Sequence, residues 1–384
     1  MQTINVQLKK VIDTSYGITV GAGLLARLPE MLKRECPASS YVIIADKATE
    51  KLFGRTLEAE LKKAGSKVLL LSVPNGELSK SQKEKSRLEE AMLKAGVDRK
   101  AVVLALGGGV VGDLAGFVSA TYMRGIPYIQ LPTTLLAMVD SSVGGKTGIN
   151  NKRGKNLIGA FHQPSAVYAD VETLKSLSDV EIRNGLVEAV KMFMTSDKES
   201  FEFAKEHLDE ALTRNADILA EIIARAVRIK AGVVERDEYE NGERMVLNFG
   251  HTIGHAIEKL SGFKMLHGQA VAVGIMVEAQ IAHTLGRLSA QALSEVREIL
   301  ARLETPLSVL KKMKPATIIA MTKGDKKSVA GQARYVILKE IGKVEEKDGR
   351  FVEEVGDEEV MRAINNTNVR TKDTKVRTRK SLHG

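Results

Sequence analysis

The chain has 384 residues, which is enough for two domains with substantial apolar cores, and its content of 43% hydrophobic and 27% charged residues is ordinary for a globular protein. No stretch reaches the roughly 18 uncharged apolar residues of a membrane helix, and the N-terminal residues lack the apolar core of a signal peptide, so we expect neither membrane insertion nor secretion. The single cysteine, Cys36, cannot form an internal disulfide, which predicts a reducing, cytoplasmic location.

The net charge of +9 is partly concentrated at the C-terminal end. Residues 367–384 carry six lysines and arginines against one aspartate and show no periodicity, which predicts a disordered basic tail. This tail has no aromatic side chains to stack on bases, so we do not expect a nucleic-acid partner. The positive charge left on the body suits a small anionic substrate.

Short apolar runs alternate with helical patterns in the first half of the chain. The strand-like runs are 41–45, 67–73, 101–106 and 128–132, and the helical patterns are 47–64, 80–95 and 110–121. Strands that are buried on both faces appear as continuous apolar runs. The pattern therefore predicts a Rossmann-like α/β domain with a mostly parallel sheet.

Helical periodicity dominates after about residue 176. Helices are expected at 178–194, 215–236, 249–260, 268–286, 290–304 and near 357–365, with one late strand-like run at 333–338. We therefore expect an α/β domain over residues 1–175, a mainly α-helical domain over 176–366 and the basic tail over 367–384.

A glycine run follows the strand-like segment 101–106. Residues 107–112 satisfy G-x-G-x-x-G, which either lets a pyrophosphate approach a helix N-terminus or allows close packing of helix on strand. The run comes several strands into the domain, and the usual acidic residue about twenty positions later is missing. Asp46, directly after the first strand, is a better candidate for a ribose hydroxyl. Gly145, Lys146 and Thr147 resemble the end of a P-loop, but Asp140 replaces its first glycine, which excludes that motif.

The stretch 133–156 is rich in polar residues and glycine. Lys146, Arg153, Lys155 and Asn156 fall within eleven positions, as expected for a loop that wraps an anion or for a solvated basic loop.

Three of the seven histidines fall within residues 251–267. His251 and His255 are four residues apart, which places them on one face of a helix, and His267 begins the next apolar run. Glu188, in an apolar helical segment, could join His251 and His267 as a third metal ligand. The alternatives are a proton shuttle, a buried histidine without a function, and a partly exposed Glu188 paired with Lys191.

Seven segments together resemble the 3-dehydroquinate synthase family of sugar phosphate cyclases, over roughly residues 40 to 345. They are PNGELSK (74–80), GGGVVGDLAGFVSATYMRG (107–125), LPTTLLAMVDSSVGGKTGIN (131–150), GKNLIGAFHQP (154–164), GLVEAVK (185–191), LNFGHTIGHAIE (247–258) and LHGQAV (266–271).

The resemblance implies an NAD-binding α/β domain, a helical domain that binds a metal, and a homodimer with its active sites between domains. It implies Zn²⁺ or Co²⁺ held by Glu188, His251 and His267. The implied NAD+ contacts are Asp46, Glu77, Lys80, Gly108, Gly109, Asp113, Thr133, Thr134, Asp140, Lys146, Lys155, Thr173, Leu177 and Glu181. The implied substrate contacts are Lys155, Asn156, Lys230, Arg244, one of Lys326 and Lys327, and Arg124 reaching the neighbouring subunit's site. The implied catalytic residues are His255, Lys146, Lys191, Asn248, Asp140 and Glu240.

The activity that the resemblance implies is a carbon–oxygen lyase of the shikimate pathway, which leads to chorismate and the aromatic amino acids. Its substrate, 3-deoxy-D-arabino-heptulosonate 7-phosphate, is transiently oxidised by NAD+, loses phosphate by β-elimination, is reduced again, opens its ring and closes a carbocycle by an aldol step. Gln269 departs from the glutamate usual in the family, and metal affinity could shift if that acid supports a ligand. The alternatives are an inosose- or valiolone-type cyclase, a metal-dependent glycerol-type dehydrogenase, and a regulator that has lost catalysis.

Overall fold

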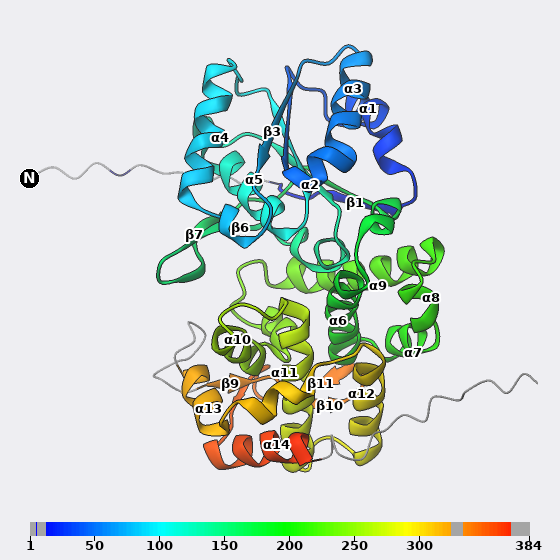
Figure 1. Cartoon of the computed structure of the whole chain (residues 1–384), viewed down its shortest axis with the longest axis vertical. Coiled ribbons are helices and arrows are strands. Elements are labelled where there is room, and N and C mark those ends of the chain that lie inside the picture. Colours follow the sequence, from blue (N-terminus) through cyan, green and yellow to red (C-terminus); the bar gives the residue numbers. More distant parts are fainter. Residues whose placement is uncertain (1–4, 6–12, 324–332, 370–384) are drawn as a thin grey trace, which may run out of the picture. The chain divides into compact units, whose positions relative to one another are not determined.

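The chain forms two compact units, which are labelled by element in Figure 1. A computed structural model describes residue 5, residues 13–323 and residues 333–369. The first unit comprises Met1–Thr133 and Gly145–Asp170, and the second comprises Thr134–Gly144 and Val171–Gly384. Among the described residues, no helix combines the length and apolar character that crossing a bilayer requires.

The first unit is built on a six-stranded sheet in the order β1-β8-β5-β4-β2-β3, in which every pairing is parallel. Its strands are β1 (Gly17–Gly21), β2 (Tyr41–Asp46), β3 (Val68–Val73), β4 (Val102–Gly107), β5 (Tyr128–Pro132) and β8 (Ala166–Asp170). The four strands predicted from continuous apolar runs are confirmed. β1 and β8 were not predicted, because β1 is short and partly exposed and β8 lies outside the regular alternation of strand and helix.

Helices cover both faces of this sheet, and the strands lie between them in Figure 1. The helices are α1 (Leu24–Glu35), α2 (Lys47–Thr49), α3 (Arg55–Lys63), α4 (Gln82–Lys94) and α5 (Gly109–Thr121). Alternate residues of β2 point to opposite faces: Val42 and Ile44 join the core beneath α4 and α5, and Ile43 joins the core beneath α1 and α3. Two cores of this kind are what a doubly wound α/β domain requires.

The glycine-rich stretch predicted as a loop is partly a β-hairpin, so that prediction was wrong. β6 (Lys146–Asn151) pairs antiparallel with β7 (Gly154–Phe161), and a π-helical turn (Ala137–Ser141) precedes them. Glycine makes this pairing possible, because a Cβ on Gly159 would lie 2.0 Å from the Thr147 carbonyl oxygen. Alternation of polar and apolar residues is weak here, which explains why the hairpin was missed.

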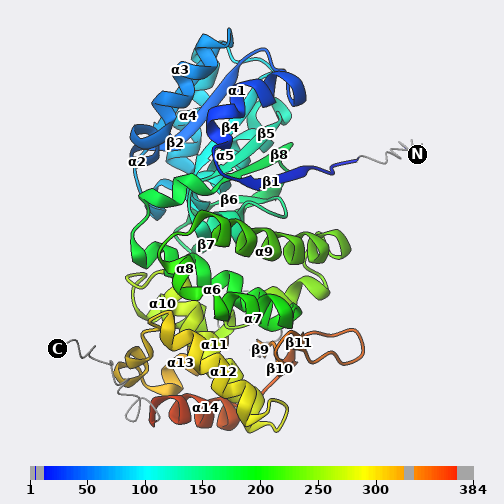
Figure 2. The same ribbon diagram turned by 90° about the vertical axis from the view of Figure 1, so that its right-hand side faces the viewer.

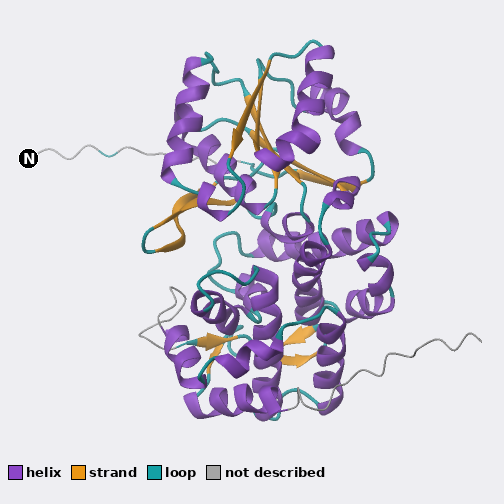
Figure 3. Ribbon diagram, in the orientation of Figure 1, coloured by secondary structure: helices purple, strands orange, loops and turns teal. Residues whose placement is uncertain are grey.

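The second unit is mostly helical, as the colouring of Figure 3 shows. Its α-helices are α6 (Asp179–Ser196), α7 (Lys198–Glu206), α8 (Leu208–Leu212), α9 (Ala216–Arg236), α10 (His251–Leu260), α11 (His267–Thr284), α12 (Ala290–Arg302), α13 (Pro315–Lys323) and α14 (Asp357–Val369). Its short strands are β9 (Arg334–Tyr335), β10 (Leu338–Glu340), β11 (Lys343–Val344) and β12 (Glu353–Glu354). The predicted run 333–338 therefore divides between β9 and β10.

Helix α11 is the centre of the second unit, and α6, α10, α12 and α14 pack against it. It is apolar on nearly all sides, as expected for a helix enclosed by others. It approaches the start of α10 closely, since a Cβ on Gly274 would lie 1.9 Å from the Gly250 carbonyl oxygen. Gly250 itself has a φ of 77°, which favours glycine.

The disordered tail was predicted to begin at residue 367, which is too early. Residues 367–369 belong to α14, where Thr367 is buried and its hydroxyl donates to the Ala363 carbonyl at 2.9 Å. Residues 370–384 lie outside the described residues, as do Lys326 and Lys327.

Candidate active site

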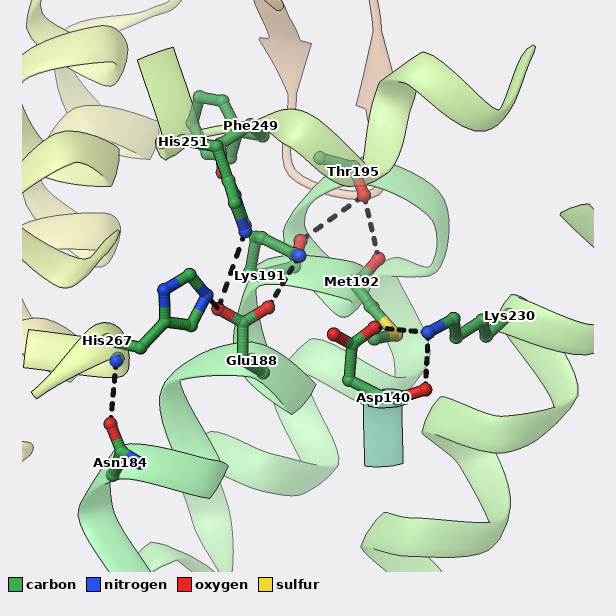
Figure 4. A network of polar contacts seen from close by, with 12 residues as sticks. Asp140, Asn184, Glu188, Lys191, Met192, Thr195, Lys230, Phe249, His251 and His267 are labelled. Carbon is green, nitrogen blue, oxygen red and sulfur yellow. Dashed lines mark hydrogen bonds and ion pairs between the residues drawn. The ribbon is translucent and has the colours of Figure 1, made fainter. Parts of the chain in front are cut away.

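Glu188, His251 and His267 come together in the second unit from α6, α10 and α11 (Figure 4). The Glu188 Oε1 atom lies 3.9 Å from His251 Nε2 and 3.5 Å from His267 Nε2. One ligand atom from each residue lies within 4.8 Å of the other two. This is the donor set, one carboxylate and two imidazoles, that a catalytic zinc or cobalt site uses.

The Nδ1 atoms of His251 and His267 face hydrogen-bond acceptors, which hold the two rings in an orientation suited to metal binding. His251 Nδ1 lies 3.1 Å from the Phe249 carbonyl oxygen, and His267 Nδ1 lies 3.4 Å from Glu258 Oε2. Since both partners only accept hydrogen bonds, each Nδ1 carries the proton. Each Nε2 faces Glu188, and it is this nitrogen that would bind a metal once it is free of a proton.

Glu188 is completely buried, so the alternative of a partly exposed glutamate is wrong. Its Oε2 accepts a hydrogen bond from Lys191 Nζ at 2.5 Å, but its Oε1 has no hydrogen-bond partner. A buried carboxylate oxygen left in this state costs several kilocalories per mole unless a cation satisfies it. Of the buried carboxylate oxygens in the described residues, Glu188 Oε1 is the only one without a hydrogen bond.

His251 and His267 each begin a helix, and side chains from neighbouring helices satisfy N–H groups at these helix starts. Buried Glu278 accepts from the backbone N–H of Gly250 at 2.8 Å and of Ile253 at 3.3 Å. Asn184 Oδ1 accepts from the Gly268 N–H at 2.6 Å. A helix N-terminus repels a nearby cation, and the negative charge of Glu278 offsets this at α10.

The pKa of His267 is raised above its ordinary value. Burial alone lowers it, but the hydrogen bond to Glu258 and the charge of Glu188 outweigh the effect of burial. A proton competes with a metal for this ring, so the raised pKa strengthens the decrease of metal affinity toward acid pH.

A second polar cluster consists of an ion pair between Asp140 and Lys230 of α9 (Figure 4). Lys230 Nζ lies 2.6 Å from Asp140 Oδ1 and also donates to the Asp140 carbonyl. Although burial raises the pKa of Asp140, the Lys230 charge overcomes this and lowers the pKa below its ordinary value. Burial lowers the pKa of Lys230, and the Asp140 charge only partly offsets it. Lys230 makes two hydrogen bonds, so one ammonium N–H is left to bind a ligand.

The other polar residues of this unit also form pairs. Buried Arg244 donates to the Glu238 carbonyl and, at 3.2 Å, to the Gly144 carbonyl, so it holds backbone segments together. Asn248 Nδ2 lies 3.0 Å from Glu240 Oε1, and Glu240 has an unusual φ of 61° for a residue other than glycine. The His255 ring centroid lies 5.2 Å from that of His251, as their spacing of four predicts.

In the first unit, the carboxyl ends of β2 and β4 flank the position where the strand order reverses. From β2 the chain passes outward to β3, then returns to β4 and continues to β5 on the other side. Asp46 ends β2, and the glycine run ends β4 and begins α5. Ligands of open α/β sheets bind at this switch point. The glycine run is therefore well placed, although it follows the fourth strand.

The N-terminus of α5 is open to an anion. Its N-cap, Gly108, has no side chain to satisfy the first N–H groups. Gly107 allows the tight turn, because a Cβ there would lie 2.7 Å from a Val111 methyl group. Asp46 caps α2, accepting from the Thr49 N–H at 2.9 Å and the Thr49 hydroxyl at 3.0 Å, and its oxygens retain lone pairs for a ribose hydroxyl.

Buried Lys80 links α5 to the β6–β7 hairpin. It donates to Asp113 and to the Asn156 side chain, and the neighbouring Glu77 accepts from Asn150 Nδ2 at 2.7 Å. Four of the predicted residues, Glu77, Lys80, Asp113 and Asn156, are therefore joined or adjacent. Lys146 is exposed at the start of β6 and Lys155 is half-buried in β7.

The other predicted residues are distributed over both units. Thr133 is buried at the end of β5, and exposed Arg124 lies after α5 with a φ of 69°. In the second unit the Thr134 hydroxyl accepts from the Ala137 N–H at 3.2 Å, and the Leu177 carbonyl accepts from Arg214. Glu181 accepts from Asn184, and Thr173 is buried.

The sequence reasoning missed the supporting residues Glu258, Glu278 and Asn184. Each is a polar side chain in an apolar stretch of helix, and that signal led to Glu188 but was not followed elsewhere. Gln269 makes no hydrogen bond to His251 or His267. Its Oε1 instead accepts from the Leu266 N–H at 3.2 Å and caps α11, a role that glutamine and glutamate both perform.

Comparison with known proteins gives consistent results. The family model for the 3-dehydroquinate synthase N-terminal region matches residues 70–184, and that for the C-terminal region matches residues 185–328. The 3-dehydroquinate synthase of Symbiobacterium thermophilum is 44% identical over 335 residues, which cover 86% of this chain and 93% of that protein.

Two solved structures of sugar phosphate cyclases are also similar. The crystal structure of 2-deoxy-scyllo-inosose synthase, complexed with carbaglucose-6-phosphate, NAD+ and Co²⁺, has a TM-score of 0.83 at 26% identity and covers 91% of this chain and 96% of that chain. The 2-epi-5-epi-valiolone synthase from Streptomyces hygroscopicus subsp. jinggangensis, with NAD+ and Zn²⁺ bound, has a TM-score of 0.85 at 27% identity and covers 95% of this chain and 100% of that chain.

Proposed function

Because this chain belongs to the 3-dehydroquinate synthase family, we propose how its side chains divide the work of the family's reaction. That reaction converts 3-deoxy-D-arabino-heptulosonate 7-phosphate to 3-dehydroquinate and phosphate, which makes the chain a carbon–oxygen lyase. The enzyme uses NAD+ and one divalent metal ion. The assignments of single residues that follow are the proposal.

Glu188, His251 and His267 are the proposed metal ligands. The observation that carries this is the buried Glu188 Oε1, which lacks a hydrogen bond and faces the Nε2 atoms of His251 at 3.9 Å and of His267 at 3.5 Å. A divalent ion bound there supplies Lewis-acid chemistry to a substrate oxygen. Glu258 and the Phe249 carbonyl hold the histidine rings in position, and Lys191 balances the charge on the other oxygen of Glu188.

The switch point of the parallel sheet is the proposed NAD+ site. Bound NAD+ supplies a reversible acceptor for one hydride. Gly108 and Gly109 would allow the pyrophosphate to reach the N-terminus of α5, and Asp46 would accept from a ribose hydroxyl. Lys80 is already paired with Asp113, so we assign it to holding the hairpin and this helix together.

The anionic groups of the substrate are assigned to basic side chains. Lys230 has one N–H left for the substrate carboxylate, while Arg244 fixes the backbone at Gly144 beside it. Lys146, Lys155 and Asn156 of the hairpin are proposed for the phosphate, together with one of Lys326 and Lys327. Such preorganised donors lower the barrier by holding the charged groups of the substrate in a reactive geometry.

Proton transfer is assigned to His255. It lies one turn beyond His251, and its ring centroid is 5.9 Å from that of His267. It is partly exposed, so its ring nitrogens can exchange protons with a substrate hydroxyl. Asn248 and Glu240 are proposed as a polar pair that orients that hydroxyl.

A homodimer is also part of the proposal. Strand β7 belongs to a two-stranded sheet with β6, and it exposes Leu157, Ile158 and Phe161, each by more than 40%. An apolar patch on a strand edge favours pairing with a second copy. Arg124 and its neighbour Met123 both have positive φ, a strained turn that an intersubunit contact would explain.

We retain the two-domain division near residue 175 and the cytoplasmic location as proposals. The compact units change over between Asp170 and Val171, and the second also takes in Thr134–Gly144, which supports two domains with an exchanged segment. Cys36, the only cysteine, supports the location.

The reaction is tested by incubating the enzyme with the heptulosonate phosphate and NAD+, with and without a chelator. We expect phosphate and 3-dehydroquinate in equal amounts, no net NADH, and loss of turnover with the chelator. Accumulating NADH would indicate a glycerol-type dehydrogenase instead, and turnover of a sugar phosphate without a carboxylate would indicate a sister cyclase.

The ligand assignment is tested by His267→Ala, with His207→Ala as the matched control. His207 lies in the same unit but pairs with Glu210. We expect His267→Ala to lose bound metal and activity together while His207→Ala keeps both. A His267→Ala protein with full metal content would contradict the assignment.

A further inference from the structure

The second unit contains a cavity of about 660 Å³ at the C-terminal ends of α6 and α9. Residues of the β10–β11 hairpin, labelled in Figure 2, line one side of it, and none of the proposed active-site residues lines it. Its volume lies within the roughly 300–1,000 Å³ typical of small-molecule sites.

The wall of this cavity has an apolar part. It includes three buried valines, which are Val233 of α9, Val344 of β11, and Val246. The partly buried ring of Phe351 lines the same cavity. Such a surface would bind a compact apolar group and release its water.

The charged part of the wall favours an anion. Arg228, Lys339 and Lys343 are exposed and make no side-chain ion pair or hydrogen bond within the described residues. Two of the three acidic groups of the cavity already have partners: Asp197 caps α7, and Glu243 forms two hydrogen bonds of 2.6 Å with Arg236. Asp197 keeps its charge as a cap and Glu346 is the third acid, so the three cations outside the Arg236–Glu243 pair face two carboxylates and leave an excess of positive charge.

The same segments build both this cavity and the active site. Helix α6 carries Glu188, and its last two residues, Thr195 and Ser196, line the cavity; Thr195 lies seven residues or roughly 10 Å further along the helix than Glu188. Helix α9 carries Lys230 next to Ile229, a cavity residue. The Thr195 hydroxyl donates to the Lys191 carbonyl at 3.2 Å, so the wall is bonded directly to active-site backbone.

We propose that this cavity is a second ligand site, which binds a small organic carboxylate with a compact apolar body. The carboxylate would lie against Arg228, Lys339 and Lys343, and the apolar body against Val233, Val246 and Val344. Three cations beside an apolar surface select such a molecule over an inorganic anion or a neutral apolar compound.

The test is calorimetric titration of the full chain, loaded with metal and NAD+, with phenylacetate as the probe. Phenylacetamide lacks the charge and acetate lacks the apolar body. We expect one saturable phenylacetate site and at least fivefold weaker binding of the other two. A Lys339→Gln/Lys343→Gln variant should bind phenylacetate roughly two- to thirtyfold more weakly, the range expected for two exposed ion pairs.

The matched control is Lys311→Gln/Lys312→Gln, which removes the same charge from exposed positions of the same unit outside the cavity. It should bind phenylacetate as the wild type does. Absence of saturable binding, equal weakening in both variants, or equal affinity for acetate or phenylacetamide would each overturn the proposal. Arg228→Gln provides an independent variant with the same expected direction if the double variant does not fold.

Discussion

Glu258 is predicted to control metal affinity although it is not one of the proposed metal ligands. It is buried on α10, and its Oε2 lies 3.4 Å from Nδ1 of the ligand His267. A carboxylate in this position fixes the imidazole tautomer and makes the opposite nitrogen a stronger donor. Replacing such a partner usually weakens metal binding by about 10- to 100-fold, or about 1.4 to 2.8 kcal/mol.

The separation of 3.4 Å places Glu258 at the lower end of that range. Charge-assisted hydrogen bonds are usually about 2.7–2.9 Å long, so this contact is weaker than an optimal one. We expect Glu258→Ala to weaken Zn²⁺ binding about tenfold. Glu258→Gln keeps an acceptor but loses the charge, and we expect about a threefold loss.

The assay is competition with a chromogenic chelator for Zn²⁺, together with the visible absorption spectrum of the Co²⁺ form. Because the spectrum reports on donor strength, it should shift in Glu258→Gln even if the protein is equally stable. The control is Glu206→Gln, which removes the same charge from an exposed glutamate on α7, a helix that carries none of the proposed metal ligands. The reasoning fails if Glu258→Ala binds metal as tightly as the wild type and the Co²⁺ spectrum does not change.

Asp140→Asn leaves the Lys230 charge buried without its partner and should destabilise the protein by about 3 kcal/mol at pH 7, measured by urea unfolding. Because the pKa of Asp140 is lowered when folded, its contribution is complete above the ordinary value of 3.8, so the difference from the wild type should hold from pH 8 to about 4 and shrink only below that. Gln269→Ala should lower thermal stability through loss of the α11 cap, by about 1 kcal/mol, while Gln269→Glu should leave metal affinity within twofold; a large affinity gain would show that residue 269 acts on the metal. Deletion of residues 370–384 should leave kcat and KM unchanged, and an inactive truncation would show that this segment has a role beyond solvation.

The strands of the first unit were predictable because a buried parallel strand leaves a continuous apolar run. YVIIA became β2 and AVVLAL became β4 almost residue for residue. The β6–β7 hairpin was not predictable in this way, because its side chains are polar, glycine or exposed apolar residues without a clear period of two. Its position depends on contacts distant in sequence, such as the bond from Lys80 to Asn156.

The proposed metal ligands illustrate what spacing can and cannot predict. His251 and His255 share a helix, so their proximity follows from sequence alone. Glu188 and His267 are 79 positions apart, and only the packing of α6 against α11 brings them together. Sequence patterns therefore suggested the residue types, and the family resemblance chose among them.

The arrangement of buried acids gives a physical reason for the proposed division between a metal ligand and its supporting residues. Asp140 is neutralised by Lys230, Glu258 faces His267 Nδ1, and Glu278 accepts from the N–H groups of Gly250 and Ile253 at the start of α10. Each of these carboxylates has a protein partner that compensates for its burial. Glu188 is different, because Lys191 satisfies one oxygen while the other has no hydrogen bond and faces the Nε2 atoms of two imidazoles, an arrangement that a cation between them would satisfy.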